Sequence, residues 1–460
     1  MVFASLTFIF LFLPAFLALD FLARRIGRGA ARNAILLLLS LLFYTWGEGV
    51  NLILLVALGF INHYAGRSIP ASRRPMLALG VFVALNLSVL FVFKYSHWMV
   101  NALHIPLGVK RLGLPLGISF FTFHAISYLV DVYRRDVAPA RNPLEFLSYF
   151  CMFPHLVAGP IVRYAQIKDD LTARGPDAEL FSFGLYRFLL GLNKKVIIAN
   201  SVAIIVDSAF TMSKSGNLHF VDSWIGILAY AVQIYFDFSG YSDMAIGLAA
   251  MAGFRFRENF LRPYSSSSIR EFWRRWHVSL SSWMRDYLYI PLGGSKGGPY
   301  ATYRNLLLVF LLCGLWHGAN LTFILWGLWH GVFLILERAR FLRPLGGAPR
   351  PLARVYAMLV VLIGWVLFRS ENVSAAWLYL SDMFGPDAKP IVLFSYGPPC
   401  VALALGILFC LVPDRLLPKP DSTNPSGFPA WVYLLQAALA VLSVSTLLGG
   451  ARNPFIYFNF

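Results

Sequence analysis

Apolar runs long enough to cross a membrane recur along this chain, and they constrain its fold more than any other feature. Residues 34–46, 76–93, 357–368 and 429–448 are examples. A spanning helix needs roughly 20 apolar residues, and backbone in lipid must satisfy its own hydrogen bonds, which favours helices. Hydrophobic residues make up 58% of the chain and charged residues 13%, which excludes an ordinary soluble domain. We therefore predict an all-α polytopic membrane protein with about ten to thirteen transmembrane and re-entrant helices.

Basic residues cluster in short segments between the apolar runs. They lie within residues 24–32 and 67–74 and at Arg134 and Arg135. Because Lys and Arg in short loops mark the cytoplasmic side, this pattern predicts a multi-pass protein whose N-terminus lies outside. Residues 1–22 carry their positive charges after the apolar run and lack a small-residue cleavage site, so we expect an uncleaved first span. The net charge of +17 then indicates contact with anionic membrane lipid and no nucleic-acid partner.

The polar stretches are short, and none is large enough for a separate soluble domain. They cover residues 134–146, 165–179, 254–304 and 413–427. We predict one integral-membrane domain, residues 1–460. Within it, residues 254–304 mix Arg, Trp, His and Tyr with a glycine-rich turn, which predicts an interfacial or re-entrant segment. The four cysteines sit in apolar runs without C-x-x-C spacing, so no metal site is predicted.

The pentapeptide Gly-Leu-Trp-His-Gly occurs at residues 314–318 and again at residues 327–331. In one unbroken helix its two histidines, His317 and His330, would point in different directions and lie about 20 Å apart along the axis. They could not then serve one site. Gly318 and Asn320 lie between them and are candidates for a helix break.

Ionisable groups inside membrane-length segments are candidates for function, because each is costly unless it is paired or hydrated. Asp237 is such a group, within the long apolar stretch of residues 224–252. Two interpretations are open. Asp237 either lines a polar cavity and supports a histidine or substrate, or belongs to a buried structural network around a helix break at Gly240.

His277 is a second candidate, in a stretch rich in Trp and Arg at residues 271–286. An amphipathic anchor at the membrane interface is the alternative interpretation of this stretch. That alternative explains Trp273, Arg275 and Trp283 well, and it explains His277 less well.

His317, followed by Asn320 within the apolar residues 306–336, is the third candidate. A lone histidine among apolar residues is commonly part of the core, but the small residues around His317 leave room for a ligand. His330 is open to both interpretations. The chain has no G-x-S-x-G, H-E-x-x-H or Walker motif, so the serine hydrolase, zinc peptidase and NTPase classes lack support. A buried neutral histidine can take a proton from a hydroxyl that attacks a thioester and return it to the leaving thiolate.

These motifs, in this order, resemble the membrane-bound O-acyltransferase (MBOAT) family. Within it they resemble the bacterial branch that includes the alginate O-acetylation membrane protein and the D-alanyl transfer protein of teichoic acid synthesis. The resemblance implies helices around a central through-membrane funnel, with the catalytic histidine at His317 and a second histidine at His277. The matching segments are residues 114–121, 153–155, 158–160, 235–247, 271–294, 304–305, 314–331 and 455–460.

The resemblance also implies the reaction. An acyl group, with acetyl favoured, passes from a cytoplasmic thioester donor, acetyl-CoA, towards an extracytoplasmic polysaccharide such as alginate, without a bound cofactor. The setting is the bacterial inner membrane, with a periplasmic acetyltransferase-like partner protein. Transfer of D-alanyl or another acyl group to a cell-wall polymer is the alternative. Arg274, Arg275 and Lys296 either meet the donor's phosphates or anchor the chain to lipid.

Our mechanistic hypothesis is that His317 acts as general base and lines a cavity through the membrane. His277 then orients or polarises the reacting groups, and Asp237 and Asn320 support them. Two other classes remain: a glycan or lipid transporter with Asp237, Asp243 and the buried histidines as relay groups, and a scaffold, which would not need those histidines.

Overall fold

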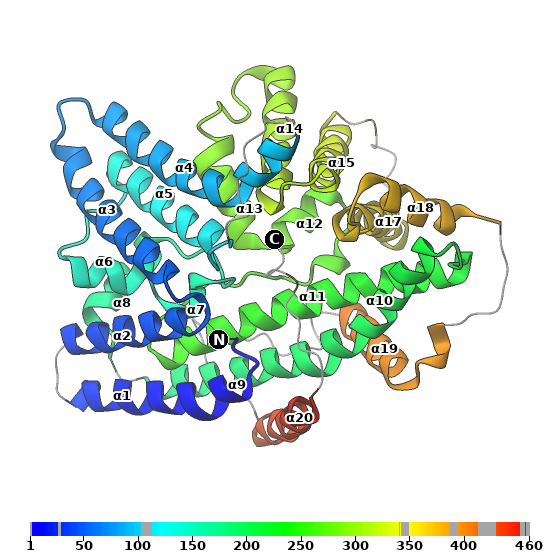
Figure 1. Cartoon of the computed structure of the whole chain (residues 1–460), viewed down its shortest axis with the longest axis horizontal. Coiled ribbons are helices and arrows are strands. Elements are labelled where there is room, and N and C mark those ends of the chain that lie inside the picture. The colour runs from blue at the N-terminus through cyan, green and yellow to red at the C-terminus, as the bar shows by residue number, and fades with distance from the viewer. Residues whose placement is uncertain are drawn as a thin grey trace. The chain divides into compact units, whose positions relative to one another are not determined.

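The protein is known from a computed structural model that describes residues 2–25, 29–102, 113–175, 177–339, 341, 349–386, 393–412, 429–450 and 456. Secondary structure in these residues is helical throughout, without strands (Figure 1), which confirms the all-α architecture. The polar stretch 413–427 and, apart from Ile456, the segment 455–460 lie outside the described residues.

Seven stretches among the described residues are long and apolar enough to cross a membrane. This finding confirms a polytopic membrane protein. The predicted total of ten to thirteen also counted re-entrant helices and stays a prediction, as does the funnel. The seven are Gly29–Glu48, Asn51–Ala71, Pro75–Val100, Ala178–Lys214, Leu321–Arg338, Arg350–Arg369 and Ala430–Leu448.

Two compact units divide the chain, and each takes several separate segments of it. The first holds Met1–Leu192, Tyr241–Arg257 and Pro420–Val444, and the second holds Asn193–Gly240, Glu258–Lys419 and Ser445–Phe460. The prediction of a single integral domain is not tested by this division and stays a prediction.

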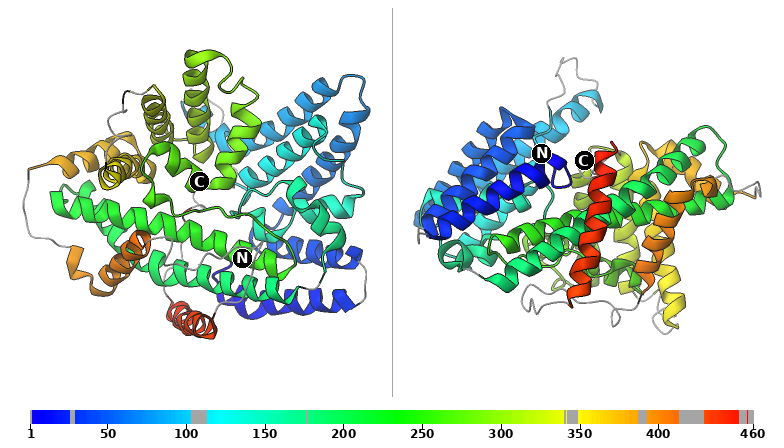
Figure 2. Two further views of the ribbon diagram at one scale, coloured as in Figure 1. Left: turned by 180° about the vertical axis from the view of Figure 1, so that it is seen from behind. Right: turned by 90° about the horizontal axis from the view of Figure 1, so that it is seen from below.

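The first unit is built on α5 (Ile118–Arg134), whose residues are buried along nearly its whole length. α3 (Asn51–Ala71) and α4 (Pro75–Ala102) pack against α5, and α1 (Leu13–Arg25) lies beside α2 (Gly29–Glu48) (Figures 1 and 2). Only 11% of the apolar window of α4 is buried, so this helix offers most of its surface to lipid. The other helices of this unit are η1 (Phe8–Phe12), α1 (Leu13–Arg25), α2 (Gly29–Glu48), α3 (Asn51–Ala71), α4 (Pro75–Ala102), α6 (Pro143–Phe150), α7 (Phe153–Leu156), α8 (Tyr164–Ala173), α9 (Ala178–Asn193) and α20 (Ala430–Leu448).

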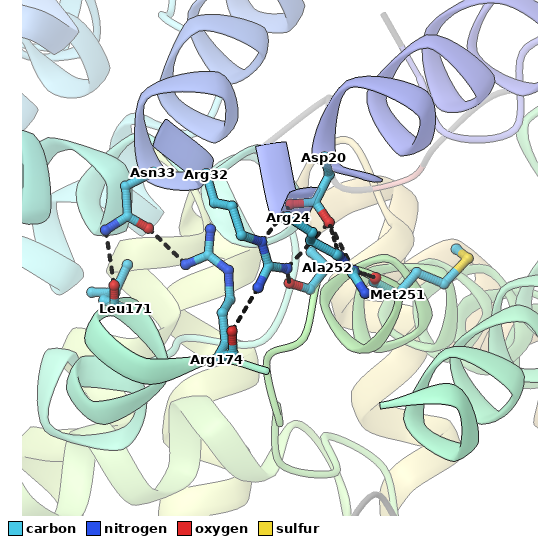
Figure 3. Close-up of polar contacts among 8 residues, drawn as sticks. All are labelled: Asp20, Arg24, Arg32, Asn33, Leu171, Arg174, Met251 and Ala252. Carbon is cyan, nitrogen blue, oxygen red and sulfur yellow. Dashed lines mark hydrogen bonds and ion pairs between the residues drawn. The ribbon is translucent and has the colours of Figure 1, made fainter. Parts of the chain in front are cut away.

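A buried ion network in the first unit contains two of the arginines from the basic segment 24–32 (Figure 3). Asp20 accepts hydrogen bonds from Arg24 at 2.8 Å and from Arg32 at 3.0 and 3.1 Å. The same two arginines donate to the carbonyls of Met251 and Ala252, at the end of α11 (Phe220–Met251). Arg24 and Arg32 therefore form hydrogen bonds within the protein. This finding corrects, for these two residues, the interpretation of the positive charges as contacts with anionic lipid.

The second unit contains the candidate residues Asp237, His277, His317 and Asn320. Residues 269–284 form two helices of seven residues each, about 10 Å long, which is too short to cross a membrane. Whether residues 254–304 re-enter the membrane stays a prediction. The helices of this unit, besides the first part of α11, are η2 (Lys194–Ala199), α10 (Asn200–Lys214), η3 (Pro263–Ser265), α12 (Ile269–Arg275), α13 (Val278–Met284), η4 (Arg285–Tyr289), α14 (Gly298–His317), α15 (Leu321–Arg338), α17 (Arg350–Arg369), α18 (Val373–Phe384), η5 (Leu393–Ser395) and α19 (Gly397–Leu411).

The repeated pentapeptide forms a helical hairpin of α14 and α15 (Figure 1). α14 ends at His317, Gly318 is extended, and the Asn320 side chain accepts a hydrogen bond from the Thr322 amide and so caps α15. The predicted helix break is confirmed. A Cβ on Gly314 would lie 2.2 Å from the Phe323 carbonyl oxygen and 3.4 Å from the Gly327 Cα. The first glycines of the two pentapeptides therefore allow the helices to touch through their backbones.

Candidate active site

His317 is the last residue of α14 and lies in a shell of aromatic rings. Its ring centroid is 4.7 Å from that of Trp316, 5.0 Å from Trp326 and 5.0 Å from Phe368, each in an edge-to-face arrangement. The residue is 4% exposed. Its position at the carboxyl end of a helix places it where the helix dipole favours positive charge.

His330 lies in the same aromatic cluster because the hairpin turns the second pentapeptide back. Its ring centroid is 5.3 Å from that of Trp326 and 5.1 Å from that of Trp273. Both histidines therefore contact Trp326, which an unbroken helix would not allow. His330 is fully buried, and neither ring nitrogen has a hydrogen-bond partner among the described residues.

The tryptophans of the second motif complete this cluster. Trp273 lies 5.6 Å from Trp326, and Trp276 lies 4.9 Å from Trp365, between ring centroids. Trp273 is 8% exposed and Trp283 6%. These side chains pack inside the protein, which corrects the interpretation of Trp273 and Trp283 as an aromatic belt at the membrane interface.

His277 sits between α12 and α13 with a left-handed backbone, φ 46°. A non-glycine residue in this region costs on the order of 1–3 kcal/mol and persists where the surroundings impose it. Its Nδ1 lies 3.1 Å from Asn259 Oδ1, and that oxygen also accepts from the Ser279 backbone amide at 3.2 Å. The Ser279 hydroxyl lies 2.8 Å from the same oxygen.

These contacts fix the tautomer of His277. A backbone amide can only donate, so Asn259 Oδ1 is an acceptor and Nδ1 of His277 carries the proton. Nε2 is then the acceptor nitrogen, and it is buried without a hydrogen-bond partner among the described residues. Burial lowers the pKa of His277 to about 3, so the ring stays neutral at physiological pH. Asn259 was not a candidate from the sequence, because its contact with His277 depends on a chain reversal that no motif marks.

Asp237 forms a buried ion pair with Lys195, with 2.6 Å between Nζ and Oδ1. Its other oxygen accepts from the Ile456 backbone amide at 2.8 Å. Among the described residues no hydrogen bond joins Asp237 to a histidine, and Asp243 pairs with Arg187 at 2.5 Å. These contacts favour the structural-network interpretation of Asp237, and its supporting role in catalysis stays a prediction.

Asn320 holds the turn of the hairpin against the end of α17. Besides capping α15, its amide nitrogen donates to the Glu371 carbonyl at 2.6 Å. The predicted supporting role of Asn320 therefore has a physical basis in the placement of His317, three residues earlier in the chain. Whether Asn320 also touches substrate stays a prediction.

A cavity of about 170 Å³ lies in the second unit, lined by residues from α10, α17 and α18. His317 does not line it, although Phe368, which contacts His317, directly precedes the lining residues Arg369, Ser370 and Glu371. The prediction that His317 faces a through-membrane cavity stays a prediction. The described residues bring no group of three or more His, Cys, Asp or Glu side chains together as a metal site.

Comparison with known proteins assigns the family. Residues 121–344 match the membrane-bound O-acyltransferase family. The chain is 48% identical over the full length of both sequences to a protein named "Probable alginate O-acetylase AlgI" from Azotobacter vinelandii. It is 46% identical to the protein of that name from Pseudomonas aeruginosa, over 84% of this chain and 75% of that one.

A peptidoglycan O-acetyltransferase from Helicobacter pylori is 33% identical over 98% of this chain and 96% of its own. The match to the family, residues 121–344, covers both pentapeptides and the segment that contains His277. This chain is an O-acyltransferase enzyme and belongs to the membrane-bound O-acyltransferase family.

Proposed function

We propose that this protein moves an acetyl group from a cytoplasmic acetyl-CoA donor to a hydroxyl of an extracytoplasmic polysaccharide such as alginate. The observation that carries the proposal is the aromatic cluster in which Trp326 contacts His317, His330 and Trp273. The names of the full-length relatives support acetyl as the acyl group and a glycan as the acceptor.

His317 acts as the general base in this mechanism. Its imidazole takes the proton of the acceptor hydroxyl while that oxygen bonds to the thioester carbonyl carbon. The tetrahedral intermediate then collapses, the carbon–sulfur bond breaks, and the thiolate recovers the proton from the imidazolium. The carboxyl end of α14 stabilises the imidazolium that exists between the two transfers.

His277 has a different role because its proton sits on Nδ1. The Nε2 of His277 can accept a hydrogen bond and thereby orient a hydroxyl. Its low pKa makes it a poor general base, since an effective base has a pKa near the working pH. We therefore assign the orienting role to His277 and the role of general base to His317.

The donor and the partner are further parts of the proposal. Arg274 and Lys296 are exposed side chains in the segment 254–304, available to meet phosphates of acetyl-CoA or lipid, whereas Arg275 is paired with Glu271 at 2.7 Å. A periplasmic acetyltransferase-like protein and the bacterial inner membrane complete the setting. The transporter alternative loses support because Asp237 and Asp243 are each neutralised by a buried cation.

Purified protein with isotope-labelled acetyl-CoA tests the proposal. We expect release of free CoA thiol and label in the ester fraction when alginate oligosaccharide or the partner protein is supplied, and neither product with His317→Ala. D-alanyl thioester in place of acetyl-CoA should give little transfer. Thiol release equal in wild type and His317→Ala would contradict the mechanism, and preferential use of the D-alanyl donor would move the assignment to the alternative acyl group.

A further inference from the structure

The cavity of the second unit has a polar rim with an aromatic floor. Lys214 pairs with Glu371 at 2.7 Å, and Arg369 pairs with Asp207 at 3.0 Å. The rings of Phe210 and Tyr379, which also line the cavity, stack with centroids 4.4 Å apart. Two cations, two carboxylates and hydroxyl side chains thus surround one apolar surface.

The charged groups of the rim retain hydrogen-bonding capacity. Among the described residues, Asp207 and Glu371 each use one carboxylate oxygen for their ion pair, so the second oxygen of each can still accept. Lys214 and Arg369 keep further N–H donors for the same reason. Lys214 also lowers the pKa of Glu371 through its hydrogen bond, so that carboxylate stays ionised. This set suits a ligand with several neighbouring hydroxyls.

The size of the cavity fits one ring. A cavity of about 150 Å³ accommodates a six-membered benzene ring, and this cavity measures about 170 Å³. A sugar ring offers hydroxyls around its edge, and charged side chains can bind them. The charged and hydroxyl side chains that line this cavity supply contacts of this kind.

The membrane side of the cavity follows from the basic residues of the same unit. Five arginines, Arg338, Arg340, Arg343, Arg350 and Arg354, lie in and beside the connection from α15 to α17, which marks that connection as cytoplasmic. α15 and α17 each have the length of one crossing. Their opposite ends, at Leu321 and Arg369, therefore lie on the extracytoplasmic face, and Arg369 lines the cavity.

The cavity is also coupled to the candidate catalytic histidine. Phe368 contacts the His317 ring at 5.0 Å, and the next three residues of the chain line the cavity. Asn320, in the turn after His317, donates to the carbonyl of Glu371 at 2.6 Å. One short segment, residues 368–371, thus has the histidine on one side and the cavity on the other.

We propose that this cavity is a sugar subsite, which binds one six-membered ring of the acceptor polysaccharide on the extracytoplasmic face. The proposal rests on the proposed acyl transfer and adds the place where the acceptor docks. The hydroxyl that reacts belongs to a neighbouring unit of the same glycan, since His317 does not line the cavity.

Binding of an alginate tetrasaccharide to the purified full-length protein tests the subsite. Ala375→Trp fills the cavity without removing a charged group, and Ser374→Trp is the matched control, exposed on the same helix and outside the cavity lining. We expect Ala375→Trp to weaken binding by about tenfold or more, because the indole occupies the ring's volume. Ser374→Trp should bind as wild type does. The double variant Asp207→Asn with Glu371→Gln removes both negative charges but keeps the size of both side chains. It should also weaken binding of the tetrasaccharide.

His317→Ala separates this proposal from the proposed function. It should bind the tetrasaccharide normally and transfer no acetyl group. Binding by Ala375→Trp equal to wild type overturns the subsite, as does acetylation of a partner protein by a wild-type enzyme that binds no sugar. Both results leave the acyltransferase mechanism in place. Acetyl transfer by His317→Ala would overturn the mechanism. The subsite would then be judged by the binding of the tetrasaccharide to Ala375→Trp alone.

Discussion

Asn259 Oδ1 lies 3.1 Å from Nδ1 of His277 and also accepts the Ser279 amide, so this single oxygen decides which nitrogen of the histidine carries a proton. The Asn259 backbone carbonyl accepts from the Val278 amide at 2.9 Å as well. Asn259 thus fixes both the backbone of the His277 turn and the orientation of its ring. We regard it as a positioning residue for the proposed reaction.

Replacement of Asn259 by Ala frees the His277 ring, and we expect kcat to fall about 10–100-fold, since misplacement by about 1 Å can cost that much. KM for the donor should change little. Asn259→Asp keeps the acceptor and should retain more activity. Its carboxylate favours the charged imidazole and so raises the pKa of His277. The rate of Asn259→Asp should therefore fall, as pH is lowered, at a higher pH than in wild type.

The pH–rate profiles of these two variants and of wild type give the measurement. In wild type, burial lowers the pKa of His277 to about 3, so its Nε2 remains an acceptor at physiological pH. Identical profiles for wild type and Asn259→Asp would show that His277 takes no part in the rate-determining step.

The glycine contact of the hairpin gives a second prediction. Gly314→Ala would place its Cβ 2.2 Å from the Phe323 carbonyl oxygen, and backbone cannot yield cheaply. We expect a loss of about 1–3 kcal/mol in the free energy of unfolding, measured by thermal denaturation in detergent. Gly331→Ala is the control, because its nearest neighbour is the Phe310 Cβ at 3.3 Å. Equal stability of the two variants would mean that α14 and α15 do not touch at Gly314.

The sequence alone predicted much of the fold. Apolar length identified an all-α membrane protein, and two small or capping residues, Gly318 and Asn320, identified the break in the repeat. The pairing of the two glycine–tryptophan–histidine segments against Trp326 could not be predicted, because it depends on how α14 and α15 pack. Residue type predicted the candidate histidines, but it could not predict which ring nitrogen of His277 carries the proton.

The interpretations that changed all concern residues with two possible surroundings. Arg32 and Trp273 are residue types found both at membrane interfaces and in protein interiors. Arg32 binds Asp20, and Trp273 packs on Trp326. A single sequence holds no information on which partner faces such a side chain, since that partner lies far along the chain.

The ion pair of Asp237 and Lys195 provides a test of whether Asp237 is structural. Asp237→Ala leaves the buried Lys195 ammonium without its carboxylate partner and should cost about 3–5 kcal/mol of stability. The double variant Asp237→Leu with Lys195→Met removes both charges and should recover much of the membrane level and the specific activity. A double variant that accumulates normally but has no activity would instead establish a role for Asp237 in the reaction.

Arg25, at the end of α1, and Arg32, in α2, offer a matched pair. Arg32→Ala leaves the Ala252 carbonyl without this donor and leaves Asp20 with Arg24 as its arginine partner, and it should cost about 1–3 kcal/mol of stability. Arg25 is exposed, with its guanidinium over the Phe21 ring at 4.9 Å, and Arg25→Ala should cost about 1 kcal/mol or less. Detergent-solubilised unfolding curves compare the two. A larger loss for Arg25→Ala would contradict the network as the stabilising element.

The measurement closest to the central claim is the acetyl-ester content of exported polysaccharide in cells with wild type, His317→Ala or His330→Leu, with membrane levels of each protein compared. His330 has no hydrogen-bond partner among the described residues, so His330→Leu should retain acetylation. His317→Ala should abolish it at an unchanged protein level. Acetylation that survives His317→Ala would contradict the assignment of His317 as the general base.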